Sequence, residues 1–172
     1  MASDDSLAFF TSANAEPPET NYATLGSRVG TGDTDGQVIL SLLFDAATDE
    51  HIDFRGHMPD HYAGGGLTLK ISFASPSATS GDAVITAAFK SITDDADDLD
   101  TKAFAAANSV TKSTASAAGE EAVATITFTD GADMDSVAAN EDFYLRISRD
   151  ANNGSDTLSG DMEFRSVAMS ET

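Results

Sequence analysis

Alternation of apolar and polar residues is the feature that most constrains the fold of this chain. Over residues 67–74, four large apolar residues alternate with polar or small ones. A period of two places successive side chains on opposite faces of a β-strand, so one face of this segment is buried and the other is solvated. Residues 122–129 and 143–148 repeat the pattern. The three segments predict strands of antiparallel sheets with one wet face.

Five further segments carry weaker versions of this pattern, and Gly, Ser, Asp and Asn are frequent between them. In the last segment, Met162 and Phe164 are out of phase with Val167 and Met169, as a β-bulge near Arg165 would produce. The five segments are residues 37–45, 50–58, 82–92, 108–114 and 161–169.

The short connections favour an antiparallel sandwich over a parallel α/β fold, which needs crossover helices. Only residues 59–64 and 131–140 could form short helical pieces. Eight or nine strands in 172 residues predict an all-β, antiparallel β-sandwich of the jelly-roll type. Its predicted core consists of the inward positions of the best strands, namely Leu40, Leu42, Phe44, Leu69, Ile71, Phe73, Ile126, Phe128, Phe143, Leu145 and Ile147.

The first 35 residues differ from the rest, because Pro and Gly interrupt scattered large apolar residues there. We therefore expect an extended N-terminal arm at residues 1–35 and a sandwich domain at residues 36–172. Large apolar side chains on such an arm are expected to dock on a partner protein. The alternative is that the arm folds back as an extra strand of its own sandwich. The candidate partner-binding residues are Leu7, Phe9, Phe10 and Tyr22.

Strong negative charge excludes several classes of partner. The chain has 29 acidic and 9 basic residues, for a net charge of -20. This charge repels phosphate backbones and anionic lipids, so neither nucleic acid nor membrane is an expected partner. No apolar run approaches the roughly 18 residues of a membrane span, and the first residues predict no secretory signal. The absence of cysteine excludes disulfides, thiolate metal sites and cysteine nucleophiles.

Candidate metal ligands occur in two places. His51, His57 and His61 lie close together, but Pro59 interrupts the helix that a zinc pair would need, so solvated or hydrogen-bonded histidines are the expectation. The loop from Asp150 to Asp156 alternates oxygen ligands as calcium loops do, yet lacks a bidentate glutamate at the right distance. A hydrated loop is the main expectation there, and calcium is the alternative.

Catalytic signatures are missing from the sequence. It contains no Gly-x-Ser-x-Gly elbow and no phosphate-binding loop. We therefore expect no enzymatic activity and no cofactor. A carbohydrate-binding sandwich is an open alternative, although sugar platforms favour Trp and Tyr and this chain has no Trp and three Tyr.

Two stretches, Pro59–Phe89 and Ile126–Glu171, resemble a small jelly-roll module of tailed-bacteriophage virions. That module occurs in capsid decoration (cement) proteins and in tail-fibre proteins. The motifs that carry the resemblance are a Tyr-Ala-Gly-Gly turn at Tyr62–Gly65, an acidic turn at Asp133–Val137, a strand end at Arg149–Asp150 and a hairpin at Asp156–Asp161.

The resemblance implies a structural virion protein on the outer capsid surface. It implies the major capsid protein as partner and a homotrimer as the assembly, because closed symmetry lets one surface serve several neighbours. The alternative function is a tail- or fibre-associated module that recognises a receptor or a carbohydrate.

Overall fold

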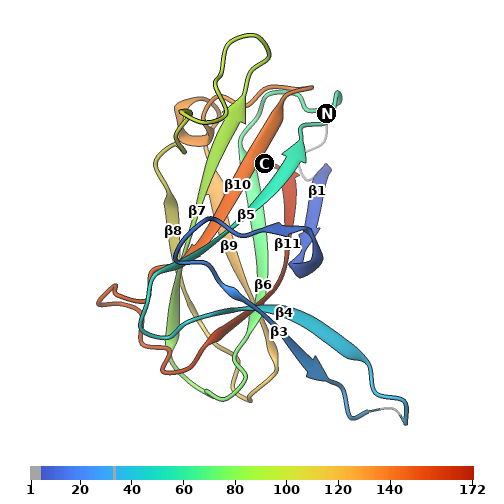
Figure 1. Ribbon diagram of the computed structural model, residues 1–172, viewed down its shortest axis with the longest axis vertical. Coiled ribbons are helices and arrows are strands. Elements are labelled where there is room, and N and C mark those ends of the chain that lie inside the picture. The colour runs from blue at the N-terminus through green and yellow to red at the C-terminus, as the bar shows by residue number, and fades with distance from the viewer. Residues whose placement is uncertain (1–4, 33) are drawn as a thin grey trace.

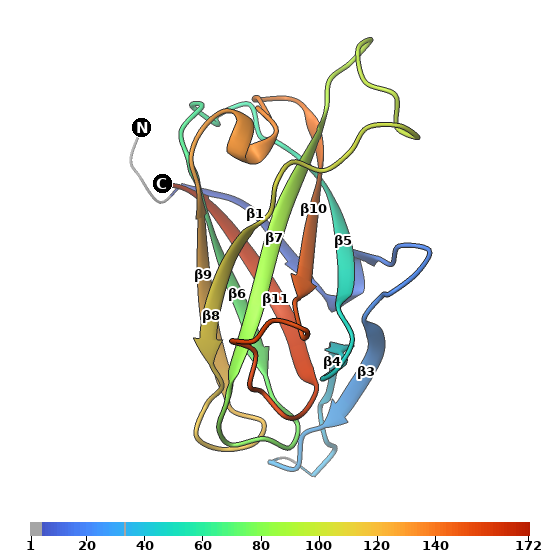
Figure 2. The same ribbon diagram turned by 90° about the vertical axis from the view of Figure 1, so that its left-hand side faces the viewer.

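The alternating segments form two antiparallel β-sheets that pack face to face. The computed structural model describes residues 5–32 and 34–172. Sheet A has the strand order β3-β4-β11-β6-β9, with β1 also beside β11, and sheet B has the order β2-β5-β10-β7-β8 (Figure 1). Figure 2 shows β9 and β6 on one side of the molecule and β10 and β5 on the other. The predicted all-β, antiparallel sandwich is confirmed.

The strands from residue 38 onward coincide closely with the predicted segments, whereas the three strands within residues 6–29 lie in the expected arm, where the sequence predicts no regular strands. Sheet A contains β1 (Ser6–Thr11), β3 (Thr24–Val29), β4 (Val38–Phe44), β6 (Leu67–Ala74), β9 (Glu121–Phe128) and β11 (Met162–Glu171). Sheet B contains β2 (Ala15–Glu16), β5 (Glu50–His57), β7 (Asp82–Ile92), β8 (Asn108–Ser113) and β10 (Asp142–Arg149).

Helical structure is confined to two 3₁₀ turns in the part of the chain that the structure describes. They are η1 (Ser12–Asn14) and η2 (Ala132–Met134). Neither could cross a membrane. The second lies inside one predicted helical piece, whereas the other piece, residues 59–64, forms only turns and ends at Gly64, whose φ of +83° is incompatible with a right-handed helix.

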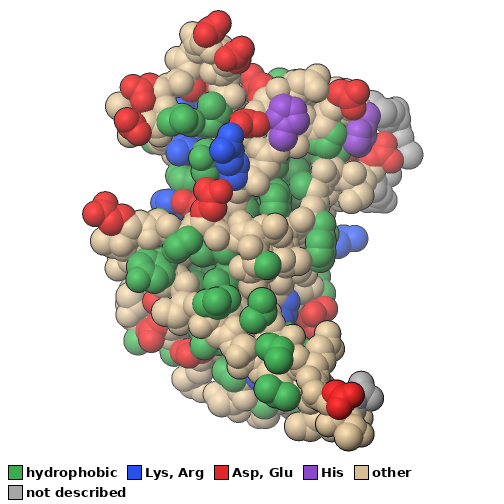
Figure 3. Space-filling view, turned by 45° about the vertical axis from the view of Figure 1, so that its right-hand side comes forward, with side chains coloured by type: hydrophobic (Ala, Val, Ile, Leu, Met, Phe, Trp, Pro, Cys, Tyr) green, Lys and Arg blue, Asp and Glu red, His purple; other side chains and the backbone are tan. Residues whose placement is uncertain are grey.

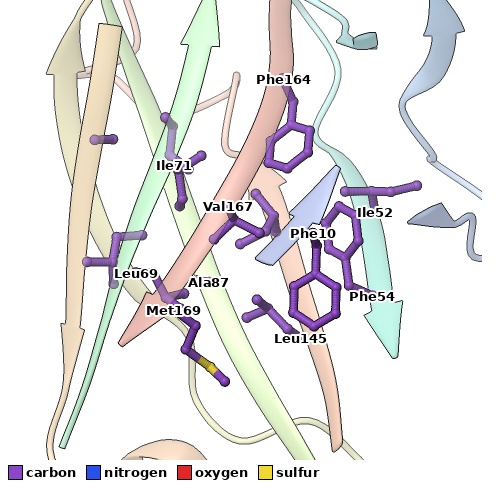
Figure 4. Close-up of a cluster of buried hydrophobic side chains, with 14 of the residues drawn as sticks. Phe10, Ile52, Phe54, Leu69, Ile71, Ala87, Leu145, Phe164, Val167 and Met169 are labelled. Carbon is purple, nitrogen blue, oxygen red and sulfur yellow. The ribbon is translucent and has the colours of Figure 1, made fainter. Parts of the chain in front are cut away.

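The core lies between the sheets and is rich in phenylalanine. Phe54 packs between Phe10 and Phe164, with ring centroids 5.4 Å from each (Figure 4). Burying each ring contributes roughly 1.5–3 kcal/mol. Gly56 makes room for this packing, since a Cβ atom there would lie 2.9 Å from the Phe10 ring and closer still to Phe143. Ten of the eleven predicted core residues are buried.

Strand β11 borders two different strands because a bulge divides it. Its register with β6 shifts between Phe164 and Ser166, which confirms the predicted bulge near Arg165. Before the bulge β11 pairs with β4, and after it β11 pairs with β1. The Ser12 hydroxyl lies where β4 and β1 separate, 3.4 Å from the carbonyl oxygens of both Leu40 and Phe164. The first half of β4 therefore pairs with β3 alone and not with β11.

The hairpin of β3 and β4 extends away from the sandwich, at the lower right of Figure 1. Leu40, the eleventh predicted core residue, lies opposite Ser27 in this hairpin and is 46% exposed. The prediction for Leu40 is wrong because β1, rather than β4, occupies the place beside β11 at this level. From Ser41 onward β4 rejoins the core, where Leu42 and Phe44 are buried.

The N-terminal segment contributes strands to both sheets. Leu7 and Phe10 on β1 are only 8% and 7% exposed and belong to the core. Strand β3 pairs along its whole length with β4, across the predicted boundary between residues 35 and 36. This is the fold-back arrangement that the sequence left open as the alternative. Residues 1–4 and residue 33 of the expected arm lie outside the described residues.

Candidate functional site

The outer face of sheet B carries a row of aromatic and charged side chains. Strand registers place Tyr144 of β10 between Arg55 of β5 and Lys90 of β7. One row along, Arg146 lies opposite Asp53. These side chains point outward because the alternate residues of the same strands fill the core. We call this surface the sheet B platform. Its residues are Asp53, Arg55, Lys90, Tyr144 and Arg146, together with Phe104.

Phe104 completes the platform from outside the strands. It lies in the connection after β7, and a backbone hydrogen bond from Ala105 to Phe89 (2.8 Å) holds that connection beside the sheet. The Lys90 ammonium lies 4.5 Å from the centroid of Tyr144 and 5.3 Å from that of Phe104. The Arg146 guanidinium carbon lies 4.3 Å from the Phe104 centroid. Cation–π attraction of about 0.5–2 kcal/mol per contact fixes the two rings and two cations as one unit.

Two ion pairs flank this unit. Arg146 donates two hydrogen bonds to Asp53, at 2.7 and 2.8 Å, which fixes the guanidinium in its plane. Arg55 donates to Asp142 at 2.8 Å, and His57 Nδ1 lies 2.8 Å from the other oxygen of that carboxylate. Hydrogen bonds from Arg55 and then His57 lower the pKa of Asp142, so it stays an ionised acceptor.

Lys90 differs from the two arginines because its ammonium faces rings instead of a carboxylate. Among the described residues, no carboxylate oxygen lies within ion-pairing distance of Lys90. Its three N–H donors are therefore available to a ligand that lies on the platform.

Two open hollows lie at opposite ends of the outward row of β10. One, of about 430 Å³, is lined by residues that include His57, Ile92 and Asp142. The other, of about 280 Å³, is lined by residues that include His51 and Ser148. Ser148 lies six positions along the strand from Asp142, which is about 20 Å. Rings flanked by donors and acceptors along such a length suit an elongated polyhydroxylated ligand.

The three histidines do not converge. His51 Nδ1 lies 3.1 Å from the Ser148 hydroxyl, and burial lowers the pKa of His51, which keeps the ring neutral at pH 7. His57 pairs with Asp142, and His61 lies 3.8 Å from Asp60. Within residues 5–32 and 34–172 no three His, Asp or Glu side chains come together as metal ligands would.

The loop from Asp150 to Asp156 uses its carboxylates internally. Asp156 accepts two hydrogen bonds from Arg149, at 2.8 and 3.1 Å, and one from the Val84 amide at 3.0 Å. Arg149 is fully buried and also donates to the carbonyl oxygens of Leu158 and Gly160, at 2.6 and 2.8 Å. The Asp156 oxygens thus hold the loop to the sandwich, and one Asp150 oxygen accepts a hydrogen bond from Asn153 within the loop, at 2.9 Å.

The four predicted partner-binding residues are not brought together. Leu7 and Phe10 are buried in the core, whereas Phe9, 62% exposed, lies on the outer side of β1 in sheet A. Tyr22, 45% exposed, lines an apolar groove beside the β3–β4 hairpin. Their roles in binding a partner stay predictions.

The sequence did not indicate the sheet B platform as a site. Alternation places Tyr144 and Arg146 on the outer face of their strand, which is a usable signal. Phe104 belongs to an alanine-rich stretch without periodicity, so nothing in the sequence brings it beside Lys90.

Comparison with known proteins identifies the fold. No protein-family model matches this chain, and no curated protein matches it in sequence. The chain is similar to the CBM22-1–GH10 modules of xylanase 10B from Clostridium thermocellum in complex with xylohexaose, at 12% identity and a TM-score of 0.56, covering 98% of this chain and 29% of that chain. It is similar to the mannan-recognising carbohydrate-binding module TmCBM27, at 8% identity and a TM-score of 0.50, covering 99% of both chains.

A bacteriophage protein is also among the similar structures. The enzymatically active domain of tailspike protein 4 from bacteriophage CBA120 is 9% identical, with a TM-score of 0.41, covering 95% of this chain and 19% of that chain. That score carries no argument about function, and none of these three structures is a capsid decoration protein. The resemblance to virion modules is therefore supported for its jelly-roll fold. The major capsid protein as partner, the homotrimer and the virion location stay predictions.

Identities this low show the fold alone. The chain has the jelly-roll sandwich fold that carbohydrate-binding modules also have.

Proposed function

We propose that this chain is a non-catalytic carbohydrate-binding module whose binding surface is the sheet B platform. The observation that carries the proposal is the cluster of Tyr144, Phe104, Lys90 and Arg146 between two hollows of one sheet face. A sugar ring has an apolar face and a rim of hydroxyl groups. Binding sites for such ligands combine aromatic surface with a few fixed polar groups.

The charged groups of the platform supply those fixed polar groups. Asp53 and Asp142 accept hydrogen bonds, and each is oriented by an arginine. An arginine carries five N–H donors, so Arg146 keeps donors free after its two bonds to Asp53. Preorganised donors and acceptors reduce the conformational entropy that is lost when a ligand binds.

The same ion pairs favour a non-catalytic role. Most glycosidases need two carboxyl groups, one of which is protonated at the working pH to act as the acid. Asp142 has a lowered pKa because Arg55 and His57 hydrogen-bond to it. Asp53 is held by both hydrogen bonds from Arg146. Asp142, which has the lowered pKa, is therefore unsuited to protonate a glycosidic oxygen and serves as a binding contact instead.

Xylan and mannan are the first ligands to test, since the xylanase modules were solved with xylohexaose and the module TmCBM27 recognises mannan. The test is affinity electrophoresis through gels that contain each soluble polysaccharide, followed by titration calorimetry. We expect the wild type to be retarded and Tyr144→Ala to bind at least tenfold more weakly, which is about 1.4 kcal/mol. Because the ligand is neutral, added salt should change the affinity little.

Phe9→Ala is the matched control, because Phe9 is an exposed aromatic residue on the opposite sheet. It should bind as the wild type does. A wild type that binds none of a panel of neutral polysaccharides would show that the proposal is wrong, and so would Tyr144→Ala binding with unchanged affinity.

A further inference from the structure

The β3–β4 hairpin has a second unusual surface, distinct from the sheet B platform. Eight large hydrophobic residues are exposed in the described part of the chain, and five of them lie here. Figure 3 shows hydrophobic side chains over the lower half of this side of the molecule, whereas the tip of the hairpin beyond them carries an acidic side chain. We call this surface the apolar ribbon face; its residues and exposed fractions are Tyr22 45%, Leu25 67%, Val29 61%, Val38 60% and Leu40 46%.

Strand register places these side chains on one side of the hairpin. Val29 lies opposite Val38, and Leu25 lies opposite Leu42, with Leu40 between them along β4. Residues directly opposite each other in an antiparallel pair point to the same side. The face continues into an open groove of about 400 Å³, which is lined mainly by apolar residues that include Tyr22 and Pro17.

The apolar ribbon face carries no charge, although the chain is densely charged. The one charged residue in β3 and β4 is Arg28. It lies opposite Ile39, in the set of residues that points to the other side of the hairpin. There its guanidinium is 3.0 Å from the buried carboxylate of Glu163. An uncharged apolar face of this size on a protein of net charge -20 is typical of a protein interface.

We propose that the apolar ribbon face docks a second copy of this chain, face against face. Two apolar ribbon faces meet without a charged side chain from either pair of strands, so this contact brings two acidic copies together without placing carboxylates against each other. The proposal is independent of carbohydrate binding.

The size of the face agrees with this occupant. A largely exposed Leu, Val or Tyr side chain buries on the order of 100 Å² when it is covered. Five such side chains on each of two copies give roughly 1,000 Å², which is the lower limit for a specific protein interface. We therefore expect a reversible association that depends on protein concentration.

Charge gives the association a definite salt dependence. Each copy carries 29 acidic and 9 basic residues, so two copies repel at long range. Salt screens this repulsion and leaves the apolar contact in place. The association should therefore strengthen as salt rises, which is the reverse of an interface held by ion pairs.

The test is sedimentation equilibrium of the full chain over a wide concentration range, at about 0.05 M and about 0.5 M sodium chloride. We expect a mass that rises above one chain with concentration, and more readily in high salt. Leu25→Ser and Leu40→Ser should each weaken the association at least tenfold. Leu99→Ser is the matched control, because Leu99 is 59% exposed on another loop, and it should associate as the wild type does.

Three results would overturn the proposal. They are a monomer at every concentration and salt, an oligomer that Leu25→Ser and Leu40→Ser leave intact, and loss of polysaccharide binding in those two variants without any change of mass. Thermal melting of each variant shows whether the fold is intact, so that a lost association is not confused with unfolding.

Discussion

Leu40 and Leu42 are two residues apart on the same side of one strand, yet one side chain is exposed and the other is buried. Leu42 is 4% exposed in the core, whereas Leu40 is 46% exposed on the apolar ribbon face. Both belong to the same alternating pattern in the sequence. The difference is that sheet B covers the second half of β4, while the first half has left sheet A at the bulge of β11. Periodicity fixes which side of a strand is apolar, and the layer above decides whether that side is buried.

The sandwich and the β3–β4 hairpin also differ in how deeply their charged side chains are buried. The sandwich buries Arg149 completely and pairs it with Asp156, whose side chain is 2% exposed. Arg28, the one charged residue in the hairpin strands, points away from the apolar ribbon face, and its side chain is 29% exposed beside Glu163. Stability should therefore depend steeply on side chains of the sandwich and weakly on those of the hairpin.

The largest expected effect compares these two arginines. Arg149→Gln leaves the buried Asp156 carboxylate uncompensated and should lower the free energy of unfolding by about 3–5 kcal/mol. Arg28→Gln should lower it by about 1 kcal/mol or less, since Arg165 still lies 3.5 Å from Glu163. Urea denaturation of both variants measures the difference. Equal losses would show that the hairpin is as firmly built as the sandwich.

A smaller effect concerns alkaline pH. Burial raises the pKa of the Tyr62 phenol to about 12, while an unfolded tyrosine titrates near 10. The raised pKa means that stability is fully present below pH 10 and is lost as the pH rises toward 12, by about 2 kcal/mol. Tyr62→Phe should be less stable at pH 7, because it loses the hydrogen bond to the Gly65 carbonyl oxygen. It should lose less than the wild type between pH 10 and 12, and identical pH profiles would contradict the burial of this phenol.

The smallest effect is expected in the hairpin itself. Leu40→Ala removes a half-exposed side chain, so the free energy of unfolding of dilute protein should change by no more than about 0.5 kcal/mol. Thermal unfolding at low protein concentration is the measurement. A loss of 2 kcal/mol or more would mean that Leu40 is covered in the dilute protein and that the contrast with Leu42 is wrong.

Most of the fold could be predicted from the sequence, because apolar and polar residues alternate in a strand that has one face buried between two sheets. Even the bulge near Arg165 was visible, since an extra residue shifts the phase of the pattern. Leu40 could not be placed correctly, because its exposure depends on β1, more than 25 residues away, taking the place beside β11. Long-range competition of this kind leaves no local signal.

The candidate site was less predictable than the fold. Tyr144 and Arg146 could be assigned to an outer face from alternation alone. Phe104 reaches them through a connection without periodicity, and Lys90 becomes notable only because its ammonium faces two rings. The burial of Leu7 and Phe10 has no signal in the Pro- and Gly-interrupted N-terminal segment, because it depends on the pairing of the short strand β1 with β11 at the other end of the chain.

We expect polysaccharide to bind to the sheet B platform and the apolar ribbon face to have a separate role. The measurement is titration calorimetry of the wild type, Tyr144→Ala and Leu25→Ser with a polysaccharide that retards the wild type in the gel. We expect Tyr144→Ala to bind at least tenfold more weakly than the wild type and Leu25→Ser to bind with unchanged affinity. Loss of binding in Leu25→Ser with unchanged binding in Tyr144→Ala would contradict this expectation, because the groove beside the hairpin would then be the carbohydrate site.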